Sequence, residues 1–161
     1  MKSIILNITL LSIIVCLNHK NIQADSLNSV RDSLIKQLEI AEEDTNKVNL
    51  LSHLSLIYIR INANEGLNYA KQSLELSNRL SWKNGKALSY KSLGENYRHL
   101  RNIDSALINL TKSLKMFEDI GIEWQVGALS SNIGMIYLDQ SNFPKAKNYL
   151  ESNNFKFTLS N

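Results

Sequence analysis

A pattern that repeats about every forty residues is the feature that most constrains how this chain can fold. The clearest copy, residues 87–114, places apolar side chains three or four positions apart on both sides of a short polar break. That spacing predicts two helices, each of which buries one stripe. The positions that become equivalent when the sequence is shifted by one repeat are Gly94 and Gly134, Tyr97 and Tyr137, Ala106 and Ala146, and Leu110 and Leu150. Tandem copies with a constant period predict a solenoid, in which each unit buries its apolar face against its neighbours.

The polar break in this copy, residues 101–104, is short enough to predict an antiparallel helical hairpin. We expect Asp104 to accept hydrogen bonds from the free amides that open the second helix. Gly94 lies inside the first predicted helix, where glycine costs up to about 1 kcal/mol relative to alanine. A residue with that cost indicates a close approach, and we expect the partner helix to lie against Gly94.

The repeated residues resemble the tetratricopeptide repeat. The resemblance covers roughly residues 46–150 and is best in the middle copy, where it rests on Tyr90, Leu93, Gly94, Tyr97, Ala106, Leu110 and Ser113. The chain departs from the family in three ways: its period is longer, Ser55 stands where the family has glycine, and the proline that often closes a repeat is absent. The resemblance implies an all-α, right-handed α-solenoid of antiparallel hairpins that serves as a binding scaffold.

The repeat pattern divides the chain into five expected parts. Residues 1–24 are expected to be a signal peptide, and residues 25–45 a helix that caps the array. Three repeats are expected to follow, at residues 46–83, 84–122 and 123–157. The first of these needs a hairpin turn that is shorter by one residue.

The amino terminus is typical of a secretory signal, because a basic start precedes a short apolar run from Ile4 to Leu17. Ala24 supplies the small residue that signal peptidase prefers, so cleavage is expected just before Asp25. The protein is then exported to the periplasm or cell envelope. An uncleaved membrane anchor and a cytosolic helix are the alternatives. Cys16 is the only cysteine, and its loss leaves no thiol for disulfide, metal or redox chemistry.

The charge balance gives no electrostatic case for a nucleic acid partner. The formal net charge is +3, and removal of Lys2 and Lys20 with the predicted signal leaves +1. Proteins that bind nucleic acids generally need a concentration of positive charge to neutralise phosphates.

No group of side chains in the sequence predicts catalysis. His53 and His99 lie on the first helices of different repeats, without a second ligand at metal-binding spacing. The acidic residues 42–44 are more typical of a solvent-exposed helix end than of a metal site or a catalytic acid–base pair. Glycine-rich phosphate loops, nucleophile elbows and metalloprotease helices are absent. We therefore predict a non-enzymatic protein with no catalytic, metal-binding or cofactor-binding residues, no cofactor and no small-molecule substrate.

The resemblance implies a concave groove lined by the first helices of successive repeats. The positions that face such a groove in the family correspond here to Asn49, Ser52, Leu56 and Ile59 in the first copy, Leu88, Lys91, Glu95 and Arg98 in the second, and Ala128, Ser131, Met135 and Leu138 in the third. A charged centre with apolar flanks suits an extended peptide or a helix of a partner protein. The charged residues do not reproduce the Lys, Asn and Arg arrangement that clamps chaperone tails in some family members.

The last predicted helix departs from the repeat. Asn154 stands at the position that Leu74 and Leu114 occupy in the earlier copies, and residues 153–159 alternate between polar and apolar. Either the end is frayed and pairs with another molecule, which would allow self-association, or the chain is cut short relative to a longer ancestor, which we favour. The leading functional hypothesis is an exported scaffold that binds a protein or peptide. The alternative is the truncated sensory region of a bacterial histidine kinase or transcriptional regulator that lacks its output domain.

Overall fold

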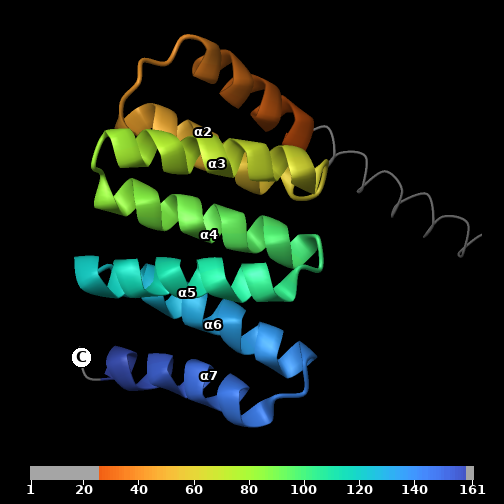
Figure 1. Ribbon diagram of the computed structural model, residues 1–161, viewed down its shortest axis with the longest axis vertical. Coiled ribbons are helices and arrows are strands. Elements are labelled where there is room, and N and C mark those ends of the chain that lie inside the picture. The colour runs from red at the N-terminus through yellow and green to blue at the C-terminus, as the bar shows by residue number, and fades with distance from the viewer. Residues whose placement is uncertain (1–25, 159–161) are drawn as a thin grey trace, which may run out of the picture. The chain divides into compact units, whose positions relative to one another are not determined.

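The computed structural model describes the backbone of residues 26–158 and the side chains as far as Glu151 (Figure 1). The predicted signal peptide and Cys16 lie outside these residues. The described chain falls into two compact units, a helix over residues 26–39 and a larger unit that begins at Ile40. Among the described residues, no helix combines the length and the apolar content needed to cross a membrane.

The larger unit consists of helices that are stacked in chain order (Figure 1). Adjacent helices pack against one another throughout, and α4 also packs directly against α2. The helices pair as the hairpins α2–α3, α4–α5 and α6–α7. Their bounds are α2 Thr45–Tyr58, α3 Ala63–Arg79, α4 Lys83–His99, α5 Ile103–Ile120, α6 Glu123–Asp139 and α7 Phe143–Thr158. The prediction of an all-α solenoid is confirmed.

One kind of turn recurs at the end of successive helices and explains the length of the repeat. A left-handed residue follows α3, α4, α5 and α6, and the residue after it donates its N–H to the carbonyl oxygen five residues earlier, at 2.8–3.0 Å. This pattern closes the free carbonyl groups at a helix end. The left-handed residues are Ser81, Arg101, Gly121 and Ser141. Because these positions are evenly spaced, one helix with its turn makes up half of a repeat, and a hairpin with its following turn makes up a whole one.

Asparagine caps the second helix of each hairpin, and the prediction for Asp104 is wrong. Asn102 Oδ1 accepts a hydrogen bond from the Ser105 amide at 3.2 Å, whereas Asp104 lies inside the first turn of α5. The equivalent residues Asn62 and Asn142 cap α3 and α7 in the same way. The turn places the capping position directly after the left-handed residue. Asp104 lies two residues beyond that position and therefore does not cap the helix.

The close approach predicted at Gly94 is present. A methyl group on Gly94 would lie 2.6 Å from Leu110 Cγ and 3.1 Å from the Leu110 backbone nitrogen. Gly134 has the same relation to Leu150, at 2.8 Å from its Cγ. Glycine in the first helix of these hairpins therefore makes room for a leucine of the second.

The second and third hairpins share an apolar core. Phe117 is fully buried at its centre and is the largest fully buried side chain in the described chain. The other buried members are Ala87, Ala106, Leu110, Leu114, Val126, Leu129, Ile133 and Ile136. These residues come from α4, α5 and α6, so this core joins one hairpin to the next.

The junction between the first and second hairpins combines a smaller apolar cluster, Leu67, Ala70 and Leu93, with a set of buried polar side chains. Ser73 on α3 lies 2.8 Å from Ser52 of α2 and 2.6 Å from Ser89 of α4, measured between hydroxyl oxygens. All three serines are buried. We call this set, with the fully buried Asn96 of α4, the polar seam. Buried hydroxyl groups are tolerated here because they bond to one another.

Asn96 is held tightly in the polar seam. Its Nδ2 donates to Ser55 Oγ at 2.8 Å and to the Ser92 carbonyl oxygen at 2.8 Å. Within the described chain, Asn96 Oδ1 is buried without a hydrogen bond. This oxygen lies close to Gly66, where an added methyl group would be only 2.1 Å from it. Glycine at position 66 therefore makes room for the Asn96 side chain.

Helix α7 continues to Thr158, through most of the segment in which polar and apolar residues alternate. Self-association through this helix stays a prediction.

Candidate functional site

The first helices of the three hairpins contact one another directly through polar side chains. Asn96 of α4 donates to Ser55 of α2, and Asn132 of α6 donates from Nδ2 to Glu95 Oε1 of α4 at 2.7 Å. Lys91 Nζ on α4 also donates to Gln125 Oε1 of α6, at 3.0 Å. These bonds fix the spacing of α2, α4 and α6 and with it the shape of the surface that they form.

Two adjoining pockets lie along this surface. The first has a volume of about 470 Å³, and we call it the α2–α4 pocket. The residues that line it are Leu56, Ile59, Arg60, Lys91, Glu95, Arg98, His99 and Asn132. Five of the twelve residues that the family resemblance places in the groove are among them, namely Leu56, Ile59, Lys91, Glu95 and Arg98.

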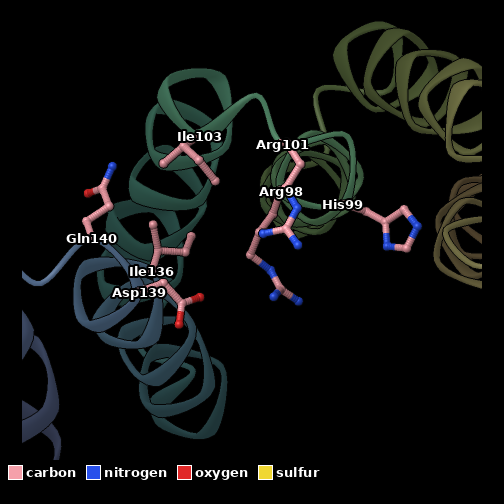
Figure 2. Close-up of a pocket in the computed structure, with 7 residues that line it drawn as sticks. All are labelled: Arg98, His99, Arg101, Ile103, Ile136, Asp139 and Gln140. Atoms are coloured by element: carbon pink, nitrogen blue, oxygen red, sulfur yellow. The ribbon is translucent and has the colours of Figure 1, made fainter.

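The second pocket lies between the carboxyl ends of α4 and α6 and has a volume of about 630 Å³ (Figure 2). We call it the α4–α6 pocket. The residues that line it are Arg98, His99, Arg101, Ile103, Ile136, Asp139 and Gln140. Arg98 and His99 border both pockets, so the two pockets adjoin at these side chains, and together we call them the groove.

Positive charge prevails in the groove. Four basic side chains, Arg60, Lys91, Arg98 and Arg101, face two carboxylates, Glu95 and Asp139. Burial lowers the pKa of the Lys91 ammonium group, and this effect exceeds the opposing attraction of Glu95. The groove therefore presents a surface that favours a partner with negative charge.

Glu95 organises the centre of the groove. Its Oε2 accepts hydrogen bonds from Arg98 Nη2 at 2.9 Å and Nε at 3.1 Å, while its Oε1 accepts from Asn132. Only 8% of Glu95 is exposed, so a partner has little access to it. Its role is to hold Arg98 in place and to tie α4 to α6.

Two of the predicted groove residues pack inside the protein. Ser52 is only 3% exposed and lies in the polar seam, so the prediction that it contacts a partner is wrong. The reason is that α4 packs against α2 on this side and covers it. Leu88 is half-buried and packs against the apolar core of the second and third hairpins.

The predicted residues of the third copy are accessible but lie outside the two pockets. Ser131, Met135 and Leu138 are exposed on α6 and line neither pocket. Ala128 is exposed there as well, whereas Asn49 on α2 is half-buried and lines neither pocket. Whether a partner extends beyond the groove to Met135 and Leu138 stays a prediction.

Several lining residues were missed, most of them because they lie at helix ends and in turns. They are Arg60, His99, Arg101, Ile103, Asn132, Ile136, Asp139 and Gln140. The family analogy points to the middle of each first helix, where neighbouring helices cover part of the surface. A usable signal was the equivalence of His99 and Asp139 under a shift of one repeat, which places two ionisable side chains at the same helix end.

In the part of the chain that the structure describes, no three His, Cys, Asp or Glu side chains are grouped so that they could hold a metal ion.

Comparison with solved structures finds a similar fold. The crystal structure of the apo form of RapI superimposes with a TM-score of 0.67 at 17% sequence identity, over 83% of this chain. This chain corresponds to 38% of the length of RapI. The likeness shows a helical-repeat fold. No family model matches the sequence, and no curated protein matches it.

Proposed function

We propose that this chain is a long-period repeat protein of the tetratricopeptide type that binds a peptide or protein segment in the groove. The observation that carries the proposal is that the two pockets adjoin at Arg98 and His99 and draw residues from all three hairpins. A groove of this kind can accept an extended chain or a short helix, and its mixture of isoleucine and charged walls suits a peptide.

We propose further that the protein acts after export. The basic and apolar amino terminus supports a signal cleaved after Ala24, which would place the scaffold in the periplasm or cell envelope. No group of side chains in the sequence supports an enzyme, so the proposed action is binding alone. The second candidate is the sensory region of a signal-transduction protein. It is kept because the exported sensory regions of such proteins resemble long-period repeats of this kind.

A bulky label at His99, at the border of the two pockets, tests the binding site. His99 is exposed and borders both pockets, and Cys16→Ser makes an introduced cysteine the only thiol of the full chain. We expect peptides selected from a phage-displayed library of random dodecapeptides to bind a His99→Cys variant, and labelling with a fluorescein maleimide to weaken binding at least about tenfold. Fluorescence anisotropy with rhodamine-labelled peptides measures the affinity.

Lys115→Cys in the same background is the matched control. Lys115 is exposed on α5 and lines neither pocket, so the same label there is expected to leave peptide affinity within about twofold. Equal loss from both labels would place the binding site elsewhere. A library that yields no binding peptide would contradict the proposed function.

A further inference from the structure

We infer that the α4–α6 pocket selects an acidic side chain of the bound segment, whose carboxylate lies between Arg98 and Arg101. This inference rests on the proposed function and adds the chemical class of the ligand. The guanidinium groups of both arginines reach into the space between α4 and α6, and His99 points away from it (Figure 2). Two guanidinium groups beside one pocket are an arrangement that suits a carboxylate.

Arg101 is free to take a ligand. Within the described residues, its side chain makes no hydrogen bond and no ion pair, and it is exposed. A guanidinium group carries five N–H donors, and all of those on Arg101 are available. An incoming carboxylate would therefore not displace an internal partner.

Arg98 is a positioned donor rather than a free one. Its Nε and Nη2 each donate one hydrogen bond to Glu95, which leaves both N–H groups of Nη1 and one of Nη2 for a ligand. Because Glu95 is itself held by Asn132, the Arg98 side chain is fixed before a ligand arrives. A fixed donor loses less conformational entropy on binding than a mobile one.

The backbone keeps the two arginines on one side of the turn. Arg101 adopts a left-handed conformation, with φ of 61°, and its N–H donates to the Arg98 carbonyl oxygen at 3.1 Å. The equivalent positions of the other left-handed turns hold serine or glycine, so the turn itself does not require an arginine. The long side chain at this position is thus available for recognition.

The remaining walls favour a single negative charge. Ile103 and Ile136 provide apolar contact for the methylene groups of an aspartate or glutamate, and a drier surrounding strengthens its ion pair. Asp139 on the opposite wall and Glu95 beside Arg98 both repel added negative charge. A carboxylate carries less charge than a phosphate group, so we expect an acidic residue to bind better than a phosphorylated one.

Peptides selected from the dodecapeptide library test this inference on the full-length chain. Each aspartate or glutamate of the tightest peptide is replaced in turn by asparagine or glutamine. We expect one such change to weaken binding at least about tenfold, because it removes a charge-assisted hydrogen bond. Replacement of the same residue by phosphoserine should not strengthen binding.

The Arg101→Gln variant then tests whether Arg101 is the side chain that binds the carboxylate of the peptide. We expect this variant to bind the acidic and amide peptides with affinities that differ by less than about threefold. The matched control is Arg60→Gln in the α2–α4 pocket, which should keep the full discrimination. Both side chains are exposed and take no part in the core, so both variants are expected to fold.

The outcomes separate this inference from the proposed function. Peptides that are blocked by the His99 label but show no preference for an acid, or an acid preference that survives Arg101→Gln, would overturn the inference alone. Tighter binding of the phosphoserine peptide would also overturn it. Loss of the acid preference in Arg101→Gln, with its retention in Arg60→Gln, would support it.

Discussion

Replacing Phe117 with alanine is expected to lower the free energy of unfolding by about 3–5 kcal/mol, the range for removing a buried aromatic ring. Phe117 is 0% exposed and joins residues of α4 and α6 in one apolar core. Its loss removes the apolar contacts of the ring and leaves a cavity that the helices can fill only by moving. Urea denaturation followed by circular dichroism measures the change.

The first repeat supplies a matched control for this prediction. Ser77 is the equivalent of Phe117 one repeat earlier, and it is also fully buried. Its hydroxyl donates to the Ser73 carbonyl oxygen at 2.7 Å and lies 3.5 Å from Ser89 Oγ, so Ser77→Ala removes one short hydrogen bond and one long one and is expected to cost about 1 kcal/mol. A loss of less than about 1 kcal/mol for Phe117→Ala would contradict the view that this core holds the second and third hairpins together.

The second large effect is expected at Gly66. Gly66→Ala would set a methyl group 2.1 Å from Asn96 Oδ1 and 2.9 Å from the Ser55 carbonyl oxygen. Helices α2, α3 and α4 all meet here, so none can yield without disturbing another. We expect a loss of about 1–3 kcal/mol from overpacking, although alanine is the better helix former.

A double-mutant cycle separates the contact with Asn96 from other causes. Asn96→Ala alone removes the hydrogen bonds to Ser55 and to the Ser92 carbonyl oxygen and should be destabilising. In that background Gly66→Ala should cost at least about 1 kcal/mol less than in the natural chain, because most of the obstruction is gone. Additive effects of the two changes, measured by urea denaturation, would show that Asn96 does not set the requirement for glycine.

The helices and their pairing could be predicted because they depend on residues that recur. Gly94, Tyr97 and Leu110 each have a counterpart one repeat later, and small residues against leucines require a close antiparallel pair. The residues that cap the helices were harder to predict from the sequence. Asp104 is a residue type that commonly caps helices, but the left-handed conformation of Arg101 sets the cap at Asn102. The type of a side chain does not reveal backbone geometry of that kind.

The groove could be predicted only in part, because polarity does not reveal which polar residues are buried. Ser52 reads as a surface residue, yet it is buried through its contact with Ser73. Leu56, Lys91 and Arg98, which the family resemblance places in the groove, line the α2–α4 pocket, and their contact with a partner stays a prediction. The α4–α6 pocket depends on how the ends of α4 and α6 diverge, and a repeat pattern does not specify that separation.

Photo-crosslinking of a bound peptide tests the central claim most directly. A selected dodecapeptide that carries benzoylphenylalanine is irradiated with the full-length chain, and the attachment sites are identified by mass spectrometry. The account predicts attachment within residues 56–60, 91–103 and 132–140, which contain the walls of both pockets. Attachment confined to residues 64–79 of α3, residues 108–119 of α5 or helix α7 would contradict it.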